Sequence, residues 1–263
     1  MKVTGVIHMH STHSYDGKLS LLELKTFLVE RGVQFACMTE HTDYLDASAA
    51  AAFVAECRAL SDDTFVFIPG FEVPYKNAHV LHIGAEQFIG AFADADSLQR
   101  WRSITPLVIL AHPVRNAFTI DDELRTVIDG VEVWNQQYEG KAVPRLKSVA
   151  LLESLRVTRP ELVATGGLDF HRIDHWGSPL TFVEVTQLSE TNILNVLTSH
   201  RFEFGHQKRL VAATDKVTFS LAERLKSTAS ICVISLGKKV NKLLAMVGLR
   251  APRCLVRLLR ETV

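Results

Sequence analysis

Residues 6–17 read Val6-Ile7-His8-Met9-His10-Ser11-Thr12-His13-Ser14-Tyr15-Asp16-Gly17, so an apolar run ends at three histidines and a carboxylate. Alternate residues of a strand point to the same face, and His8 and His10 can therefore reach one ion together. Gly17 allows the chain to turn Asp16 back toward them. A His-x-His motif by itself is weak, because such pairs are common without a ligand role. Its weight here comes from repetition along the chain.

Ligand-type residues also stand at the ends of four later predicted strands. The residues are His41 after 35–38, Glu72 at the end of 65–72, His112 after 107–110, and Asp169 with His171 after 162–168. Strands alternate with helical patterns, which predicts parallel pairing with helices outside. About seven such units favour a closed α/β barrel, whose loops converge at the carboxyl ends of the strands. We therefore expect a metal site at that mouth.

The totals describe one globular chain. Its 263 residues are 47% hydrophobic and 22% charged, and the net charge is zero, so the overall charge gives no case for a nucleic-acid partner. No unbroken apolar stretch of about 18 residues predicts a membrane helix. The start lacks a signal-peptide pattern, and the four cysteines show no Cys-x-x-Cys spacing. We expect a cytoplasmic protein with buried, reduced cysteines.

An ordered set of motifs resembles the PHP (polymerase and histidinol phosphatase) superfamily over residues 8 to about 177. The motifs are His8-x-His10 with Asp16-Gly17, Thr39-Glu40-His41, Gly70-Phe71-Glu72, Ala111-His112-Pro113 and Gly167-Leu168-Asp169-Phe170-His171. The resemblance implies a distorted seven-stranded, TIM-like (β/α) barrel. It also implies two to three divalent ions, zinc, manganese or iron, in a site that is trinuclear when full, and hydrolysis of phosphoesters.

The resemblance also implies which side chains hold which ion. The first ion would lie among His8, His10, Glu72 and Asp169. The second would share Glu72 and take His112 and a histidine of the next strand. The third would lie among Asp16, His41 and His171. A carboxylate such as Glu72 can bridge two ions about 3.5–4 Å apart because it has two oxygens.

The histidine that follows Glu72 has two candidates. His79 and His82 are three residues apart in one predicted strand, so only one of them faces the barrel interior. The spacing from His79 to Gly84 is similar to the motif of the family, and we favour His79. His82 would then support the site from behind or face outward, and His13 would lie on the rim.

The expected chemistry needs no protein nucleophile, since metal-activated water attacks phosphorus. Neither Gly-x-Ser-x-Gly nor a phosphate-binding glycine-rich loop is present. Arg115 and Arg172 follow ligand-type residues on two loops and are candidates for binding phosphate oxygens, although arginines are commonly surface residues. His175 is the candidate proton donor to the leaving oxygen.

We expect a barrel domain over residues 1–214 and a helical extension over 215–263. The extension carries ten Lys or Arg and three Asp or Glu. Helices are expected at 219–235, 238–247 and 252–261. They either cap the barrel or bind a nucleic acid or an anionic membrane surface.

Three functions remain open from sequence. The first is a metal-dependent phosphoesterase or phosphatase acting on a small phosphorylated metabolite or nucleotide. The second is a nuclease or DNA-end-processing enzyme. The third is a non-catalytic, metal-stabilised regulatory or scaffold module, which the full set of ligand-type residues disfavours. The substrate, the native metal and the oligomeric state stay undetermined at this stage.

Overall fold

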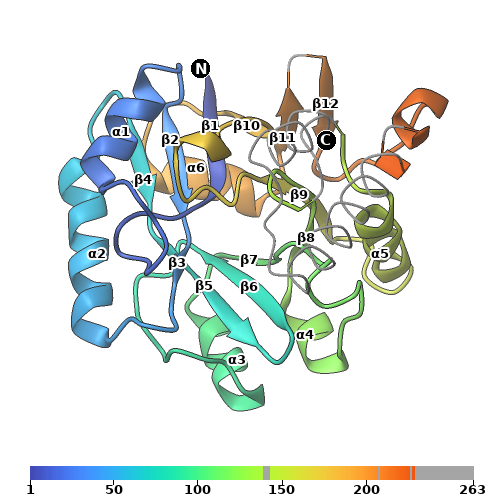
Figure 1. Cartoon of the computed structure of the whole chain (residues 1–263), viewed down its shortest axis with the longest axis horizontal. Coiled ribbons are helices and arrows are strands. Elements are labelled where there is room, and N and C mark those ends of the chain that lie inside the picture. Colours follow the sequence, from blue (N-terminus) through green and yellow to red (C-terminus); the bar gives the residue numbers. More distant parts are fainter. Residues whose placement is uncertain (139–142, 207, 226, 229–263) are drawn as a thin grey trace, which may run out of the picture.

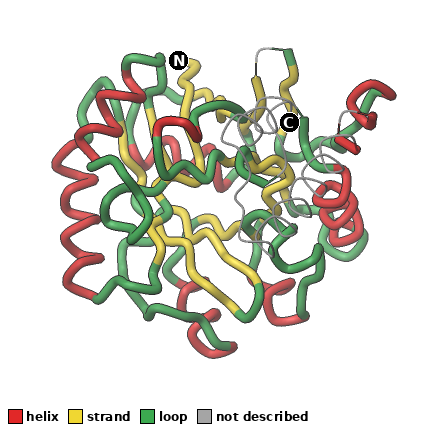
Figure 2. The backbone as a smooth tube through the Cα atoms, viewed as in Figure 1, coloured by secondary structure: helices red, strands yellow, loops and turns green. Residues whose placement is uncertain are grey.

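The computed structural model describes residues 1–138, 143–206, 208–225 and 227–228. Strands occupy the inside of the molecule and helices lie around the outside, as Figures 1 and 2 show. This is a mixed α/β fold with two six-stranded sheets. No helix in the described ranges is long and apolar enough to cross a membrane.

The first sheet is built around the opening strand. Its order is β12-β11-β10-β1-β2-β4. The strands are β1 (Lys2–Met9), β2 (Phe35–Met38), β4 (Val66–Ile68), β10 (Leu180–Glu184), β11 (Phe202–His206) and β12 (Arg209–Ala212). β1, β2 and β4 pair in parallel, whereas β10, β11 and β12 pair antiparallel. β11 and β12 lie beyond the strands expected from sequence.

The second sheet contains one reversed strand. Its order is β3-β5-β6-β7-β8-β9. The strands are β3 (Glu40–His41), β5 (Gly70–Tyr75), β6 (Ala78–Ile83), β7 (Leu107–Leu110), β8 (Gly130–Asn135) and β9 (Val163–Gly167). β6 runs antiparallel to both β5 and β7. The prediction of parallel pairing is therefore wrong at β6, because the two-residue link after β5 is too short for a parallel crossover. It is also wrong at β10, which pairs antiparallel with β1.

Backbone hydrogen bonds join the two sheets between the carboxyl end of β1 and the residues that follow β9. The Leu168 N–H donates to Ile7 O at 2.9 Å, the Phe170 N–H to His8 O at 3.1 Å and the His10 N–H to Phe170 O at 2.9 Å. The chain also passes directly from β2 to β3 and from β4 to β5. At the second passage Pro69 interrupts the single strand expected over 65–72, because proline has no N–H to donate. The carboxyl end of β1 therefore lies beside those of β3, β5 and β9.

Five of the six α-helices described begin at side-chain caps that the sequence supplies, and α5 is the exception. The six are α1 (Leu21–Val29), α2 (Ala47–Leu60), α3 (Ala95–Ser103), α4 (Asp122–Val127), α5 (Leu146–Arg156) and α6 (Glu190–Thr198), with a 3₁₀ turn at Ile173–His175. Ser20 and Glu23 form a capping box at α1, and Asp46 accepts from the Ala49 N–H at α2. The helices cover a buried apolar core that includes Phe53, Phe71 and Trp101.

The described part of the chain tests the rest of the fold prediction only partly. The two sheets agree with the α/β class. The strand pairing shows two six-stranded sheets rather than a single closed sheet of seven strands. The boundary at residue 214 stays a prediction. The helices expected over 238–247 and 252–261 lie outside the described residues, as do residues 226 and 229–235 of the helix expected over 219–235; residues 221–225 and 227–228 of that helix are helical.

Candidate metal centre

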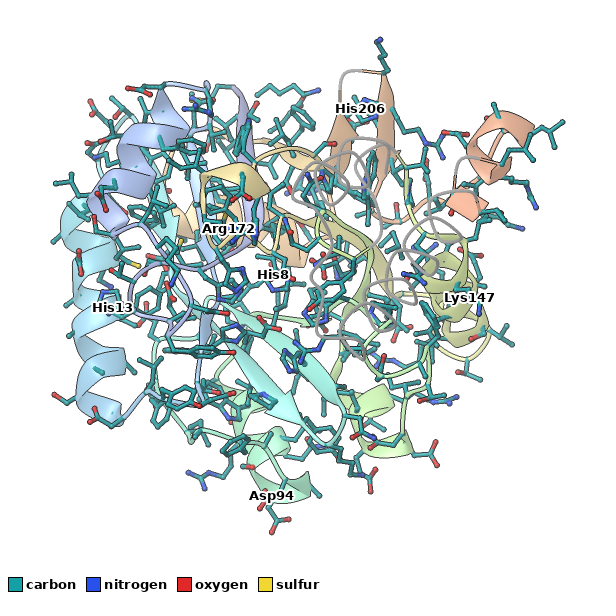
Figure 3. All side chains as sticks on the ribbon, in the orientation of Figure 1. His8, His13, Asp94, Lys147, Arg172 and His206 are labelled. Carbon is teal, nitrogen blue, oxygen red and sulfur yellow. The ribbon has the colours of Figure 1, made fainter. Side chains whose placement is uncertain are left out.

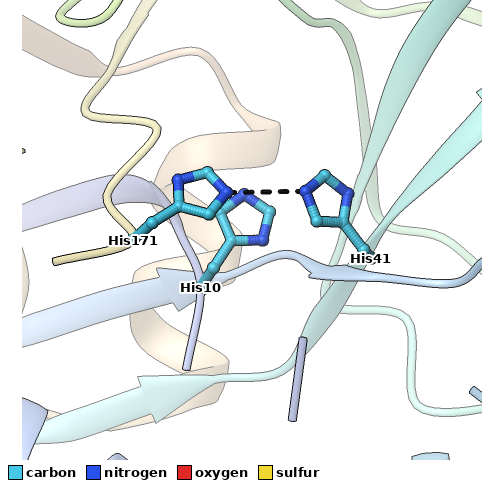
Figure 4. A group of neighbouring side chains, drawn as sticks. All are labelled: His10, His41 and His171. Atoms are coloured by element: carbon cyan, nitrogen blue, oxygen red, sulfur yellow. Dashed lines mark hydrogen bonds between the residues drawn. The ribbon is translucent and has the colours of Figure 1, made fainter. Parts of the chain in front are cut away.

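The strand ends converge on one cluster of ligand-type side chains. Three groups of such residues have ligand atoms within 4.8 Å of one another, and they overlap. The groups are His8, His10, Glu72 and Asp169; His10, His41 and His171; and His41, Glu72 and His79. Figure 4 shows the second group, with three imidazoles from three separate segments of the chain close together. The structure thus brings side chains from both sheets to one place.

Glu72 lies at the centre of the cluster. Its Oε2 is 3.0 Å from His8 Nε2, 3.2 Å from His10 Nε2 and 3.5 Å from His41 Nδ1. Its Oε1 is 3.0 Å from His112 Nε2 and in contact with His79 Nδ1. The two oxygens thus face different histidines, which is the arrangement expected of a bridging carboxylate.

Asp169 and Asp16 complete the anionic side of the cluster. Asp169 Oδ1 lies 3.5 Å from His8 Nε2 and 3.7 Å from His10 Nε2, and its Oδ2 lies 4.0 Å from His112 Nε2. Asp16 Oδ2 lies 3.2 Å from His171 Nε2 and 3.7 Å from His41 Nε2. All nine predicted ligands therefore lie in or next to the cluster.

The reversed direction of β6 separates its two histidines. The amino end of β6 lies beside the carboxyl end of β5, so His79 is at the mouth. His79 pairs with Pro74, on the same face as Glu72, whereas His82 pairs with Phe71 on the opposite face. His82 is fully buried there, with Nδ1 3.0 Å from Thr105 Oγ1 and its ring 5.0 Å from Trp101. It does not reach the cluster.

Unusual backbone conformations occur at the cluster. His8, His112 and Asp169 have positive φ angles of 68°, 22° and 50°, which L-residues seldom adopt. The register of β1 against β2 shifts between Ile7 and Met9, so His8 is the extra residue of a bulge that re-aims its side chain. Strained positions of this kind persist where surrounding structure holds them, and they concentrate at functional sites.

Hydrogen bonds select the tautomers of three histidines. His8 Nδ1 is 2.9 Å from Glu132 Oε1 and His171 Nδ1 is 2.9 Å from the Asp169 carbonyl, so both Nδ1 atoms must donate. Ser14 Oγ donates to Glu40, which leaves it as an acceptor for His10 Nδ1 at 3.3 Å. In each imidazole Nε2 is therefore the atom left to bind a cation, once it has lost any proton, and a hydrogen bond at the other nitrogen is how proteins orient metal-binding histidines.

Two buried carboxylates of this arrangement were missed by the sequence reading. Glu132 in β8 accepts from His8 Nδ1, from the His112 N–H at 2.8 Å and from Asn135. Glu40 accepts from the Ser11 N–H and hydroxyl and from Ser14, and so holds the loop that follows β1. The available signal was a single acid inside the apolar run 131–134. Gly167 is required beside it, because a Cβ there would overlap Glu132 Oε1.

The donor set fits divalent cations. Among the described residues, His10 Nε2, His112 Nδ1 and Asp16 Oδ1 are buried without a hydrogen-bond partner. Buried polar atoms without partners are costly, and a cation between them would satisfy those that face the cluster. Imidazole nitrogen and carboxylate oxygen are ligands that suit zinc, manganese and iron.

The charged groups of the cluster shift one another's pKa values. Burial opposes ionisation of Glu72, but His8, His10 and His112 outweigh it and hold its pKa well below the usual value. Burial lowers the pKa of His10 to about 3. Burial also opposes protonation of His8, but Glu132, Asp169 and Glu72 outweigh it and raise the pKa of that imidazole. The protein alone thus holds its central carboxylate ionised and ready to bind a cation.

The two predicted phosphate-binding arginines and the predicted proton donor lie in different surroundings. Arg115 is exposed beside the mouth, and its positive charge acts on Tyr15 and Tyr138. His175 lies next to the cluster, with Nδ1 3.3 Å from the Asp169 carbonyl. Arg172 Nε lies 2.7 Å from Asp174 Oδ1, and the side chain lines a groove over α1. Arg172 therefore already has an anionic partner.

His13 also lies where the sequence placed it, away from the ligands. Its Nε2 is 2.8 Å from Glu56 Oε2 on α2, and its ring is 5.4 Å from that of Phe53. Figure 3 shows His13 beside α2 and His8 near the centre of the molecule.

Comparison with known proteins gives a likeness of structure. No model of a known protein family matches the sequence, and no curated protein matches it. A solved structure of Endonuclease Q, in complex with a 27-mer duplex substrate with an abasic lesion at the active site, matches with a TM-score of 0.51 and 15% identity. The likeness is one of fold.

That match covers 76% of this chain and 57% of Endonuclease Q, so this chain corresponds to less than two thirds of that protein. A structure of the lesion-specific endonuclease PfuEndoQ from Pyrococcus furiosus has 16% identity and a TM-score of 0.48, covering 76% of this chain and 56% of that one.

Proposed function

We propose that this protein is a metal-dependent hydrolase that cleaves phosphodiester bonds in nucleic acid. The observation that carries the proposal is the cluster centred on Glu72, where overlapping groups of imidazoles and carboxylates lie at the ends of strands from both sheets. A solved structure of similar fold is that of an endonuclease in complex with a duplex substrate, which favours nucleic acid over a small metabolite. No comparison supports a small phosphorylated substrate or a membrane surface.

We further propose a barrel of the PHP type over residues 1–214. β1, β2 with β3, β4 with β5, β6, β7, β8 and β9 give seven positions in order around a ring. The hydrogen bonds between β9 and β1 would close that ring. This ordering supports the family resemblance seen in the motifs.

Two to three ions would share the cluster in this proposal. His8, His10, Glu72 and Asp169 hold the first, which is one of the groups found in the structure. Glu72, His79 and His112 hold the second. Asp16, His41 and His171 hold the third, with His10 as an additional neighbour. Such ions polarise a phosphoester and lower the pKa of coordinated water toward about 7.

The protein side chains would position and neutralise the substrate. Arg115 has no ion-pair partner among the described residues, and its planar guanidinium matches two phosphate oxygens. His175 would donate a proton to the leaving oxygen, since its ring lies 5.7 Å from that of His171 at the edge of the cluster. Arg172, paired with Asp174, would contribute to binding only by exchanging that partner.

The test is a substrate panel with protein reconstituted separately with zinc, manganese and iron. The panel holds single-stranded and duplex oligonucleotides, with and without an abasic site, together with cyclic phosphodiesters and small phosphomonoesters. We expect metal-dependent cleavage of an oligonucleotide, abolished by chelation and by Asp169→Asn or His112→Ala. His13→Ala is the control and should retain cleavage, because His13 bonds to Glu56 outside the cluster.

Cleavage of small phosphomonoesters alone would favour the metabolite phosphatase. Absence of turnover in fully metal-loaded protein would favour the non-catalytic module. The extension over 215–263 stays a candidate for binding nucleic acid through its basic residues.

A further inference from the structure

Two exposed tyrosines lie against each other at the rim of the candidate metal centre. Among the described residues, exposed aromatic side chains are Tyr15, Tyr44 and Phe92. Tyr15 is 58% exposed and Tyr44 is 78% exposed. Their rings meet edge to face, with centroids 4.9 Å apart. An aromatic pair left in water next to a polar cluster is unusual, and it is typical of a ligand-binding surface.

The pair is attached directly to the candidate ligands. The Tyr15 ring stacks at 5.3 Å on that of His41, and the neighbouring residue Asp16 faces His41 and His171. Tyr44 follows His41 by three residues on the loop before α2. The tyrosine faces therefore lie within one side-chain length of the place where a phosphoester would bind.

Charge at this rim indicates what the aromatic faces would meet. The carboxylates of Asp16 and Asp43 act on Tyr15 more strongly than the positive charge of Arg115 does, but Asp16 already faces His41 and His171. Arg115 has no ion-pair partner in the described ranges. Together with cations in the cluster, it favours an anionic group at the centre. A ligand that suits both features carries a phosphate and a flat ring next to it, which is the composition of a nucleotide.

We propose that Tyr15 and Tyr44 form a stacking platform for an unpaired nucleobase next to the phosphoester that is cleaved. The inference rests on the proposed function and narrows its substrate to a nucleotide whose base is free to leave a helix. Stacking of a base on an aromatic side chain strengthens binding and tolerates any base, because every base has a flat face. A paired base inside a duplex presents no free face, so single strands, ends and distorted positions would bind best.

The experiment measures equilibrium binding rather than turnover. The probe is a single-stranded pentanucleotide with phosphorothioate linkages and 2-aminopurine, whose fluorescence falls when it stacks. A second probe has the same backbone length with abasic positions, labelled at one end, and a third is 2-aminopurine riboside 5′-monophosphate. Each is titrated into metal-loaded protein and into Tyr44→Leu and Tyr44→Phe. Val157→Ala removes an exposed apolar side chain after α5 and serves as the surface control.

We expect the parent protein and Tyr44→Phe to quench 2-aminopurine and to bind the base-containing probe more tightly than the abasic probe. Tyr44→Leu should raise the Kd for the base-containing probe at least about fivefold, while its Kd for the abasic probe stays unchanged. Equal binding of the monophosphate and the pentanucleotide would identify a mononucleotide as the ligand, and tighter binding of the pentanucleotide would identify a strand.

The proposal is overturned if the parent protein binds base-containing and abasic probes equally. It is also overturned if Tyr44→Leu weakens both probes alike, or matches Tyr44→Phe. Binding with base selectivity but without cleavage in the substrate panel would leave the platform in place and refute the proposed hydrolase. Cleavage that is equally fast for base-containing and abasic substrates would support the proposed hydrolase and refute the platform.

Discussion

Glu132 controls two of the candidate ligand histidines from one buried position. It accepts the Nδ1–H of His8 and the backbone N–H of His112. It is not itself a member of any of the three groups of ligand-type residues. Its effect on metal binding would therefore be indirect, through the orientation and tautomer of His8.

We predict that Glu132→Gln weakens metal binding about 10- to 100-fold while the protein stays folded, because the amide removes the negative charge that orients His8. Competition with a coloured chelator measures the affinity, and circular dichroism reports the fold. Glu184→Gln, at an exposed end of β10, is the matched control and should bind metal as the parent does. Unchanged affinity in Glu132→Gln would show that His8 needs no such support.

His82 gives a prediction about acid stability. Burial lowers its pKa to about 3, from 6.5 in the unfolded chain. Between these values the unfolded chain takes up a proton that the folded protein excludes. The contribution of His82 to stability is therefore complete above pH 6.5 and is lost by about 1.4 kcal/mol for each unit below it.

His82→Leu removes this loss and leaves the Thr105 hydroxyl bonded to the Trp101 carbonyl. In chelator-treated protein we expect the unfolding free energy of the parent to fall by about 2 kcal/mol more than that of the variant between pH 7 and pH 5. Urea denaturation at both pH values measures it. Equal losses would mean that His82 takes up a proton in the folded protein.

At the scale of elements, β6 determines which histidine can serve the site. The sequence shows a strand with two histidines, and the period of two correctly indicates that they face opposite sides. Its direction is not visible in the pattern, because an apolar run reads the same in both orientations. The short link at residues 76–77 was the available signal for a hairpin.

We predict that His79→Ala loses metal and that His82→Leu does not. His79 contacts Glu72 at the mouth, whereas His82 packs on Trp101 on the other face of β6. Elemental analysis of both variants after reconstitution gives the comparison, with His79→Ala expected to hold about one equivalent less than His82→Leu. A greater loss of metal in His82→Leu than in His79→Ala would place the metal centre on the face of β6 that carries His82.

Other elements show why the sequence predicts the ligand-type residues of the cluster better than it predicts the order of the strands in the sheets. Ligand-type residues at strand ends are local features, so His8, His41, Glu72 and Asp169 could be found one by one. Sheet order depends on pairing between distant segments, such as β1 with β9 and β1 with β10. Glu132 was missed because a buried acid in an apolar strand has meaning only once His8 is seen beside it.

At the scale of the whole molecule, the cluster ties the two sheets together. Its side chains come from β1 in one sheet and from β3, β5 and β6 in the other. A cation that binds there stabilises only the folded chain, in which those elements are together. Metal binding and stability should therefore rise and fall together.

We predict that chelation lowers the melting temperature of metal-loaded protein by about 5–10 °C. Ligand at a hundredfold its Kd stabilises by about 2.7 kcal/mol, and a chain of this size shifts by about 2–4 °C for each kcal/mol. Adding back metal should restore the melting temperature. A melting temperature that changes with neither treatment would show that metal binding at the cluster does not stabilise the fold.

Elemental analysis of protein purified without added metal or chelator tests the central claim most directly. Glu72 faces histidines with both oxygens, so its replacement should affect more than one ion. We predict two to three equivalents of zinc, manganese or iron per chain in the parent protein, and a loss of at least one equivalent in folded Glu72→Gln. Fewer than one equivalent in the parent, with none taken up on reconstitution, would contradict the account.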